Sequence, residues 1–294
     1  MLELKGIYTP IATPFKGNAV AYEELENNFI FWNNSKLEGI VVLGSNGEFV
    51  ALRESEKEEM IRFCCKQTKG RKKTIIGIGG NCLGETLHLA ECSAANGADA
   101  VLVVTPFYYK NGMNDAVLGR YFSEVADKSP LPVVLYNMPG NTGVNTSSAL
   151  LSELSRHPNI IGVKDTSGNI AQIAETIRDA EASFAVFAGN WSFFLPSLHL
   201  GAKGATLALA NIFPNECCEL MELFSQGEYE KARLLQLRLM EINAAITARF
   251  GIGGLKVAME FSGLHGGDPR SPLLRPSPEA IATIRELLLR VRPQ

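Results

Sequence analysis

Several features that would assign a chain to a particular class of protein are missing from this sequence of 294 residues. No apolar run approaches the roughly 18 residues of a membrane span, and the start, MLELKGIYTP, lacks the basic and apolar regions of a signal peptide. The 28 Lys and Arg residues nearly balance the 31 Asp and Glu residues, so no basic surface for nucleic acid is expected. We therefore expect a protein that binds neither membrane nor nucleic acid.

Disulfide and metal patterns are missing as well. The cysteines form no CxxC motif, which favours free thiols in a cytoplasmic protein over a disulfide framework or a zinc site. The four histidines (88, 157, 199 and 265) stand singly, without the spacing of metal ligands. We therefore expect no metal site. The six cysteines are residues 64, 65, 82, 92, 217 and 218.

What the sequence contains instead is a repeated alternation of apolar runs with longer segments of helical period. The runs are continuously apolar, which is typical of strands buried on both faces of a parallel sheet. Eight such units predict an α/β fold of the (β/α)8 barrel type. A doubly wound sheet is disfavoured, because no Gly-rich phosphate loop follows the first run. The eight runs are 6–11, 39–44, 74–79, 100–106, 132–137, 160–165, 183–189 and 204–210.

The strand pattern stops near residue 210, and the rest of the sequence is helical in period. We therefore expect residues 1–212 to form the barrel and residues 213–294 to form a C-terminal helical appendage. No linker-like segment separates the two parts, so the appendage is expected to pack on the barrel.

Two short motifs have simple structural interpretations. GIGGLK (251–256) matches no phosphate-binding pattern and is interpreted as a turn with close packing. ESEKEE (54–59) predicts the start of a helix, with Ser55 and Glu58 forming a capping box.

Lys164 is the most informative residue at the ends of the predicted strands. Chemistry in such a barrel takes place at the C-terminal strand ends, and Lys164 is the only one of the 14 lysines that ends an apolar strand there. A partly dry barrel mouth favours the neutral, nucleophilic form of an amine, which attacks a ketone or aldehyde to form a Schiff base. The alternative is a structural lysine paired with Asp165, and strand position alone gives the two interpretations similar weight.

Polar groups at two other strand ends favour the chemical interpretation. Tyr136 ends the preceding strand at an equivalent depth, and its phenol could move protons between amine, carbonyl and substrate hydroxyl. A lone tyrosine is more often a core residue with a bonded hydroxyl. Ser45 and Asn46 lie in GSNG after the second strand, where glycines let consecutive N–H groups face one anion, such as a carboxylate. By itself, GSNG is also an ordinary turn.

The motifs YTPIATPF, GSNGEF, TPFYY, YNMPGNTG, NIIGVKD and AGN occur in this order over essentially the whole chain. In order and spacing they resemble those of the dihydrodipicolinate synthase / N-acetylneuraminate lyase superfamily of pyruvate-handling, Schiff-base-forming barrels. The resemblance implies that Lys164 is the Schiff-base lysine and Tyr136 the catalytic tyrosine. It places Ser45 and Asn46 in the loop that holds the keto-acid carboxylate. No cofactor is implied, because the imine acts as the electron sink.

The resemblance also implies further residues around the pocket. Gly189 and Thr206 correspond to backbone positions that line it, and Tyr108 in TPFYY is a further substrate-binding candidate. Family members are commonly homotetramers, built as dimers of dimers, in which a tyrosine of the strand-4 loop reaches into the neighbouring site. That catalytic tyrosine corresponds to Tyr109.

Asn141 bears on the second substrate. The family's synthases carry an arginine for the second carboxylate in a motif like YNxPxRTG, whereas this chain has YNMPGNTG with Asn141 in that place. Together with TARFGIGGLK and LHGGDPRSPL, this most resembles 4-hydroxy-2-oxoglutarate aldolases. We therefore expect a class I lyase that cleaves or joins pyruvate and an aldehyde. The alternatives are a dihydrodipicolinate synthase condensing pyruvate with aspartate semialdehyde, a 2-keto-3-deoxy sugar acid aldolase, and a non-catalytic keto-acid binder.

Overall fold

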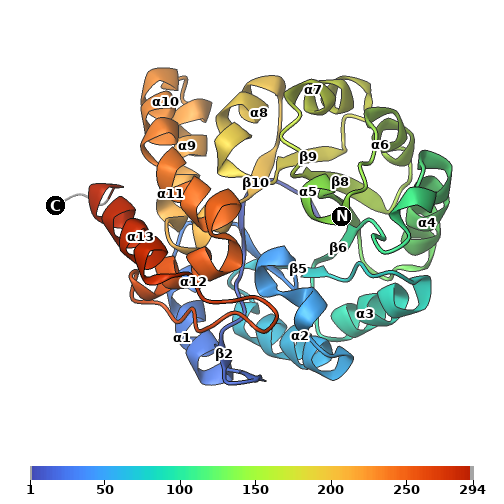
Figure 1. Ribbon diagram of the computed structural model, residues 1–294. Helices are drawn as coiled ribbons and strands as arrows, with labels where there is room; N and C mark the ends of the chain where they lie inside the picture. Colours follow the sequence, from blue (N-terminus) through green and yellow to red (C-terminus); the bar gives the residue numbers. More distant parts are fainter. Residues whose placement is uncertain (1, 292–294) are drawn as a thin grey trace.

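Eight parallel strands close into a barrel in the computed structural model, which describes residues 2–291 (Figure 1). Each strand pairs with the next along the chain, and the last closes on the first. Seven of the predicted runs contain one of these strands and the run 74–79 overlaps β5, so the predicted (β/α)8 barrel is confirmed. The strands are β1 (Gly6–Pro10), β4 (Gly39–Val42), β5 (Lys73–Gly77), β6 (Ala100–Val104), β7 (Val133–Asn137), β8 (Ile160–Asp165), β9 (Ala185–Ala188) and β10 (Gly204–Thr206).

Helices surround the barrel, and Figure 1 shows them as an outer ring. A small antiparallel hairpin, β2 (Phe15–Lys16) with β3 (Ala19–Val20), precedes the first of them. The helices of the ring are α1 (Tyr22–Asn33), α2 (Glu54–Thr68), α3 (Leu83–Ala95), α4 (Asp115–Lys128), α6 (Ser148–Leu154), α7 (Ile170–Asp179), α8 (Phe194–Leu200) and α9 (Pro214–Ser225), with the short α5 (Pro139–Thr142) before α6.

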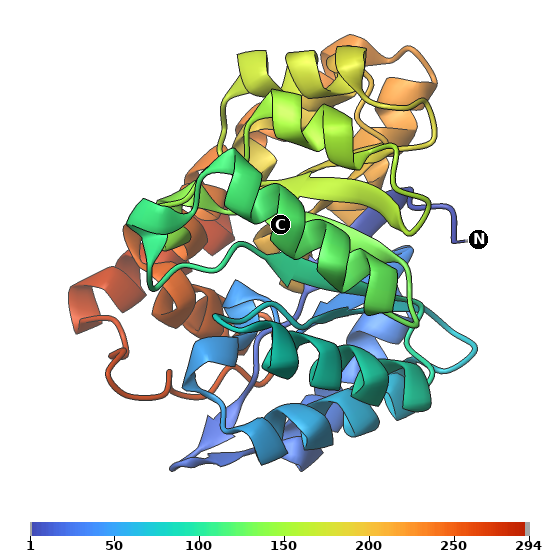
Figure 2. The same cartoon turned by 90° about the vertical axis from the view of Figure 1, so that its right-hand side faces the viewer.

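Four further helices follow the barrel. They gather on one side of it in Figure 1, and the red C-terminal segment lies on the side away from the N-terminus in Figure 2. The division at residue 212 stays a prediction, and α9, which begins just after it, contacts both α8 and β1. The four helices are α10 (Tyr229–Arg238), α11 (Met240–Ala244), α12 (Gly251–Glu260) and α13 (Pro278–Val291), with a π-helical turn at Ala245–Arg249.

Both short-motif interpretations need correction in part. GIGGLK is not a turn but the start of α12, where small residues allow close packing: a Cβ on Gly254 would lie 2.9 Å from the Ala245 oxygen. Helix α2 begins at Glu54 with Arg53 as its N-cap, and the carboxylate of Glu56 accepts the Arg53 N–H at 2.9 Å. The predicted Ser55/Glu58 capping box is therefore wrong, because the helix starts two residues earlier than a Ser55 N-cap would place it.

Side chains of the strands alternate between the barrel interior and the helix layer, as expected for a closed sheet. The interior group includes Tyr8, Tyr136 and Phe187, with the rings of Tyr8 and Phe187 in contact at 5.7 Å between centroids. The Tyr8 hydroxyl has no hydrogen-bond partner within residues 2–291, and burial raises the pKa of this phenol. Tyr8 therefore contributes packing to the interior.

The ladder between β7 and β8 contains one irregularity. Val133 pairs with Ile160, but the next residue, Val134, pairs with Gly162. Ile161 is thus an extra residue on β8, which makes this point a β-bulge. The register beyond the bulge is regular to the ends of both strands.

Two predicted exclusions can be compared with the fold. Every cysteine is a free thiol, as predicted, and only Cys82 among them is exposed. Within residues 2–291, no helix combines the length and the apolar character needed to cross a bilayer.

Candidate active site

Lys164 extends its side chain from β8 into the barrel interior. It pairs with Tyr136 in the β7–β8 ladder, and its Nζ atom lies 4.1 Å from the centre of the Tyr136 ring. Only 5% of the residue is exposed. Among residues 2–291 this amine has no hydrogen-bond or ion-pair partner. A buried amine without an acidic partner is unusual for a purely structural lysine.

Asp165, the alternative partner of Lys164, is fully engaged elsewhere. One carboxylate oxygen accepts the Ser167 N–H at 2.8 Å, and the other accepts the side-chain amides of Asn137 at 2.8 Å and Gln172 at 3.2 Å. The strand alternates sides, so this buried carboxylate faces the helix layer while Lys164 faces the interior. The interpretation of Lys164 as half of a local ion pair is therefore wrong, and the Asp165 bonds instead fix the ends of β7 and β8.

Tyr136 connects the amine to the predicted carboxylate loop. Its residue is 4% exposed, and its hydroxyl lies 3.3 Å from the Ser45 hydroxyl. Three of the predicted residues, Lys164, Tyr136 and Ser45, thus form one continuous group across β8, β7 and the end of β4. The phenol stands between the amine and the loop, which is where a proton relay between them would be required.

The loop after β4 is made of two single turns. Ser45–Gly47 form the first, Glu48 follows in the left-handed region at φ 55°, and Phe49–Ala51 form the second. The N–H groups of Gly47 and Glu48 bond within the first turn. The donors that this turn can offer an anion are therefore its first two N–H groups, the Ser45 hydroxyl and the Asn46 amide. The Asn46 amide currently donates to the Pro10 oxygen at 3.3 Å.

The two backbone positions implied by the resemblance lie at the C-terminal ends of the two strands that follow β8. A Cβ on Gly189, just after β9, would overlap the Thr166 hydroxyl and lie 2.7 Å from the Asp165 oxygen. Only glycine allows this close approach of β9 to β8. Thr206 is the last residue of β10 and is buried, one strand further round the barrel.

Three predicted residues are not brought to the amine within one chain. Tyr108 and Tyr109, in the loop after β6, are 74% and 75% exposed, and their rings contact each other edge to face at 5.0 Å. Asn141 is exposed in α5, where its N–H donates to the Met138 oxygen.

Two residues near this loop were missed by sequence reasoning. The Asn81 side-chain oxygen accepts the N–H groups of Phe107 and Tyr108, both at 3.0 Å, and so shapes the loop from β5. The Lys110 side chain lies against Gly143, where a Cβ would come within 3.2 Å of the Lys110 Cδ and 3.7 Å of its Nζ. Gly143 ends the α5 turn that contains Asn141. No sequence signal marks either contact, because each joins two separate strand-end loops.

One cluster on the outer surface could hold a cation. His88 Nε2 lies 2.6 Å from a Glu58 carboxylate oxygen and 3.8 Å from one of Glu54. The hydrogen bond to Glu58 raises the pKa of His88. This cluster joins the first turns of α2 to the first half of α3, and an ion pair explains its geometry. Histidine spacing within the sequence could not reveal it, because the ligands come from different helices.

Comparison with known proteins gives a consistent result. Residues 3–290 match the sequence pattern of the Dihydrodipicolinate synthetase family. The 4-hydroxy-tetrahydrodipicolinate synthase of Caldicellulosiruptor bescii is 36% identical over 92% of this chain and 90% of its own. The probable mitochondrial 4-hydroxy-2-oxoglutarate aldolase of Emericella nidulans is 35% identical, over 96% of this chain and 93% of the Emericella protein. The crystal structure of dihydrodipicolinate synthase from Aquifex aeolicus shares 33% identity and a TM-score of 0.93 over 97% of both chains. This chain therefore belongs to the dihydrodipicolinate synthetase family and is a pyruvate-dependent lyase of the aldolase type.

Proposed function

We propose that Lys164 forms a Schiff base with the C2 ketone of pyruvate or a pyruvate-derived 2-oxo acid. The observation that carries this proposal is the buried amine, 4.1 Å from the Tyr136 ring and without an acidic partner within residues 2–291. The neutral amine attacks C2, the carbonyl oxygen takes up a proton, and loss of water leaves a protonated imine.

The imine then serves as the electron sink for the carbon–carbon bond. In the cleavage direction, a base removes the C4-hydroxyl proton, the C3–C4 bond breaks, and its electron pair enters the imine to give an enamine and an aldehyde. Protonation at C3 and hydrolysis release pyruvate and restore the amine. We assign the proton transfers to Tyr136, which lies against the amine and 3.3 Å from the Ser45 hydroxyl.

The 2-oxo acid carboxylate is assigned to the loop that begins with Ser45 and Asn46. Its first two N–H groups make no bond within the turn, so they can donate to an anion together with the Ser45 hydroxyl and the Asn46 amide. A carboxylate held there would place the adjacent C2 ketone toward Tyr136 and Lys164, on the same side of the barrel mouth.

The second substrate has two candidates. Six similar curated relatives are named 4-hydroxy-tetrahydrodipicolinate synthase, and these names favour condensation of pyruvate with aspartate semialdehyde. Asn141, in the place of the synthases' arginine, favours cleavage of 4-hydroxy-2-oxoglutarate, the reaction named for one relative. The names support the synthase reaction more than the aldolase reaction that the motifs suggested.

Both candidates put a carboxylate on the aldehyde, and Lys110 is a suitable cation for it. Its amine lies beside Gly143, in the same turn as Asn141, and has no acidic partner among residues 2–291. We assign Lys110 to this second carboxylate, with Asn141 as a neighbouring donor. A sugar acid aldolase, whose aldehyde is a neutral polyol, has no use for this cation.

The proposed assembly is a homotetramer in the cytoplasm. Two adjacent tyrosines, each about three-quarters exposed, are unusual on a monomer's surface. We propose that a neighbouring subunit covers Tyr108 and receives Tyr109 in its site. Sedimentation of the purified protein tests the subunit number, and a stable monomer with full activity would exclude this role for Tyr109.

Trapping and a substrate panel test the proposed reaction. Incubation with pyruvate and borohydride should leave a permanent adduct on Lys164, detected by peptide mass spectrometry. The panel compares pyruvate release from 4-hydroxy-2-oxoglutarate and from 2-keto-3-deoxygluconate with condensation of pyruvate and aspartate semialdehyde. A folded protein that binds pyruvate but leaves Lys164 unmodified would instead be a non-catalytic keto-acid binder.

A further inference from the structure

Glu48, directly after the Ser45–Gly47 turn, is held by the C-terminal part of the chain. Its side chain is 1% exposed, and one carboxylate oxygen lies 2.6 Å from the Nζ atom of Lys256. The other oxygen accepts the backbone N–H of Arg270 at 2.8 Å, across 222 residues of sequence. Glu48 also has a left-handed backbone at φ 55°, which a non-glycine residue adopts only when its surroundings hold it there. The carboxylate contacts supply that restraint.

Lys256 is the second buried lysine of this protein, and it differs from Lys164 in its partners. Its side chain is fully buried in α12, pairs with Glu48, donates to the Asp268 backbone oxygen at 3.0 Å and lies 4.4 Å from the centre of the Phe15 ring. Burial lowers the pKa of Lys256, and the adjacent Glu48 opposes that shift. Each of these contacts compensates a charge that would be very unfavourable to bury alone.

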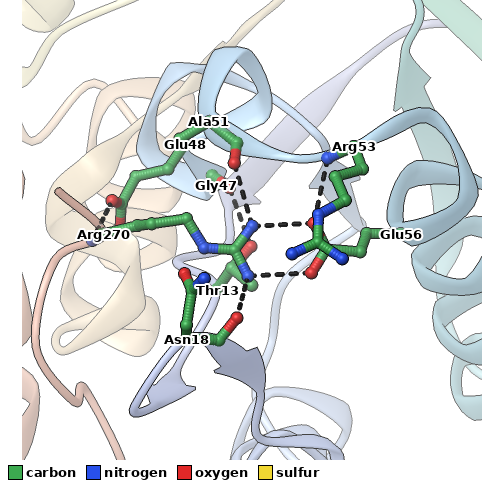
Figure 3. A network of polar contacts seen from close by, with 8 residues as sticks. All are labelled: Thr13, Asn18, Gly47, Glu48, Ala51, Arg53, Glu56 and Arg270. Atoms are coloured by element: carbon green, nitrogen blue, oxygen red, sulfur yellow. Dashed lines mark hydrogen bonds and ion pairs between the residues drawn. The ribbon is translucent and has the colours of Figure 1, made fainter.

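Arg270 binds the other end of the Ser45–Ala51 loop, at Ala51. Its guanidinium makes two bonds to the Glu56 carboxylate, at 2.7 and 2.8 Å, and donates to the backbone oxygens of Ala51 at 2.9 Å and Asn18 at 2.8 Å (Figure 3). Figure 3 shows the guanidinium between the loop, the start of α2 and the hairpin. One C-terminal segment, residues 256–270, therefore binds the loop from Ser45 to Ala51 at two points, Glu48 and Ala51.

Stability alone gives little reason for such an arrangement. A buried ion pair contributes on average no more to folding than apolar groups of the same volume. A pair with fixed geometry does, however, restrict the position of the turn to which it is attached, and the donors of that turn must meet a carboxylate within a few tenths of an ångström.

We propose that Glu48, Lys256 and Arg270 are positioning residues that set the Ser45–Asn46 turn for the carboxylate of the 2-oxo acid. None of the three touches substrate in this proposal, which rests on the proposed function of the turn. The C-terminal segment thereby becomes part of the substrate-binding apparatus, although it contributes no side chain to the barrel interior.

The test separates substrate binding from turnover. Glu48→Gln leaves an acceptor for the Arg270 N–H but breaks the ion pair, and the double variant Glu48→Gln/Lys256→Met removes both charges. We expect the pyruvate KM to rise roughly tenfold to hundredfold, as for a misplaced binding group, while kcat at saturating pyruvate changes less than threefold. Borohydride should still trap pyruvate on Lys164, but only at correspondingly higher pyruvate concentrations.

A matched control comes from the same segment. Arg275 pairs with Glu260 and Asp268 but does not touch the loop, so Arg275→Gln should change stability without changing the pyruvate KM. If the Glu48 and Lys256 variants do not fold, Arg270→Lys provides the test, since it keeps the backbone donor and loses the paired bonds to Glu56. Arg270→Lys should raise the pyruvate KM about threefold or more, because only part of the contact between Arg270 and the loop is lost.

Two results would overturn the inference in different ways. Folded variants whose pyruvate KM and trapping curve equal those of the unmodified protein would show that the contacts of Lys256 and Arg270 do not position the turn. Failure to trap pyruvate on Lys164 in the unmodified protein would instead reject the proposed function itself. A fall in kcat with unchanged KM would also contradict a carboxylate-positioning role.

Discussion

The amine of Lys164 and the ring of Tyr136 face each other across neighbouring strands, 4.1 Å apart, at paired positions of the β7–β8 ladder. Strand pairing rather than loop structure therefore sets their separation. Groups carried on strands are held more exactly than groups carried on loops, which suits the roles proposed for this amine and this phenol.

Replacing the Tyr136 hydroxyl tests the proton relay. Tyr136→Phe should lower turnover by ~10²–10⁴, the range for loss of a general acid–base group, and should slow the trapping of pyruvate. The matched control is Tyr8→Phe, which removes a hydroxyl from the same interior that has no partner within residues 2–291. The control should keep its activity and its stability. Near-normal turnover in Tyr136→Phe would exclude the relay.

Lys110 allows a test of the second carboxylate. Lys110→Gln should raise the KM of the carboxylate-bearing aldehyde or aldol about tenfold or more, since a hydrogen bond to a charged group contributes ~1.5–3 kcal/mol. The pyruvate KM should be unaffected, and Lys110→Arg should restore most of the loss. Lys128→Gln, which removes a surface lysine paired with Glu124, is the control. Equal KM values for the Lys110 and Lys128 variants would remove Lys110 from the site.

The close approach of β9 to β8 at Gly189 can be tested by adding a side chain there. Gly189→Ala would press a methyl group against Thr166 and the Asp165 oxygen, and we expect it to lower the free energy of unfolding by ~1–3 kcal/mol. Turnover should fall as well, because the strand that carries Lys164 must shift. Gly140→Ala, where no heavy atom lies within 4 Å of the new Cβ, should be neutral in chemical denaturation. Equal effects of the two substitutions would show that the close approach is not needed.

The Glu56–Arg270 pair predicts a pH dependence of stability. The hydrogen bonds from Arg270 hold the pKa of Glu56 below its usual range, so the pair stabilises the fold above the unfolded-state pKa of about 4.3. That contribution is lost as the pH falls through the lower, folded-state pKa. The difference in unfolding free energy between the unmodified protein and Glu56→Gln should thus be constant above about pH 5 and shrink below about pH 4.3.

Urea unfolding across this pH range measures the difference. Glu124→Gln, which removes an exposed pair with Lys128, should have a smaller effect at every pH, because exposed pairs contribute little. A Glu56→Gln difference that stays constant down to pH 3 would contradict the assignment.

The barrel, and the unusual position of Lys164 in it, were predictable from sequence for a physical reason. Parallel strands buried on both faces consist of continuous apolar runs, so a lysine that interrupts the end of such a run is conspicuous. The two residues of the proposed site that lie on strands, Lys164 and Tyr136, therefore became candidates together with the fold. Side-chain direction was not available in the same way: Asp165 could be separated from Lys164 only when its bonds to Asn137 and Gln172 were seen.

Lys256 and Arg270 escaped prediction because their partners are remote in sequence. Lys256 lies in a segment of small residues that suggested a turn, and nothing near it indicates a buried charge. Its partner, Glu48, follows the GSNG motif, which suggested a carboxylate-binding loop or an ordinary turn but gave Glu48 itself no role. Glu56 was likewise assigned no role beyond its helix, although it bonds both Arg53 and Arg270. Contacts between loops of different units depend on how the barrel closes, which no local pattern encodes.

The extra residue in β8 has a consequence for the chemistry of the protein. Without Ile161 as a bulge, the ladder that begins at Val133 and Ile160 would continue in simple step, and Lys164 would stand opposite Asn137 instead of Tyr136. The Lys164 amine would then point outward, among the amides that bind Asp165. The Asp165 carboxylate would point into the barrel interior instead. In the proposed mechanism, the pairing of the nucleophile with Tyr136 thus depends on one extra residue in β8.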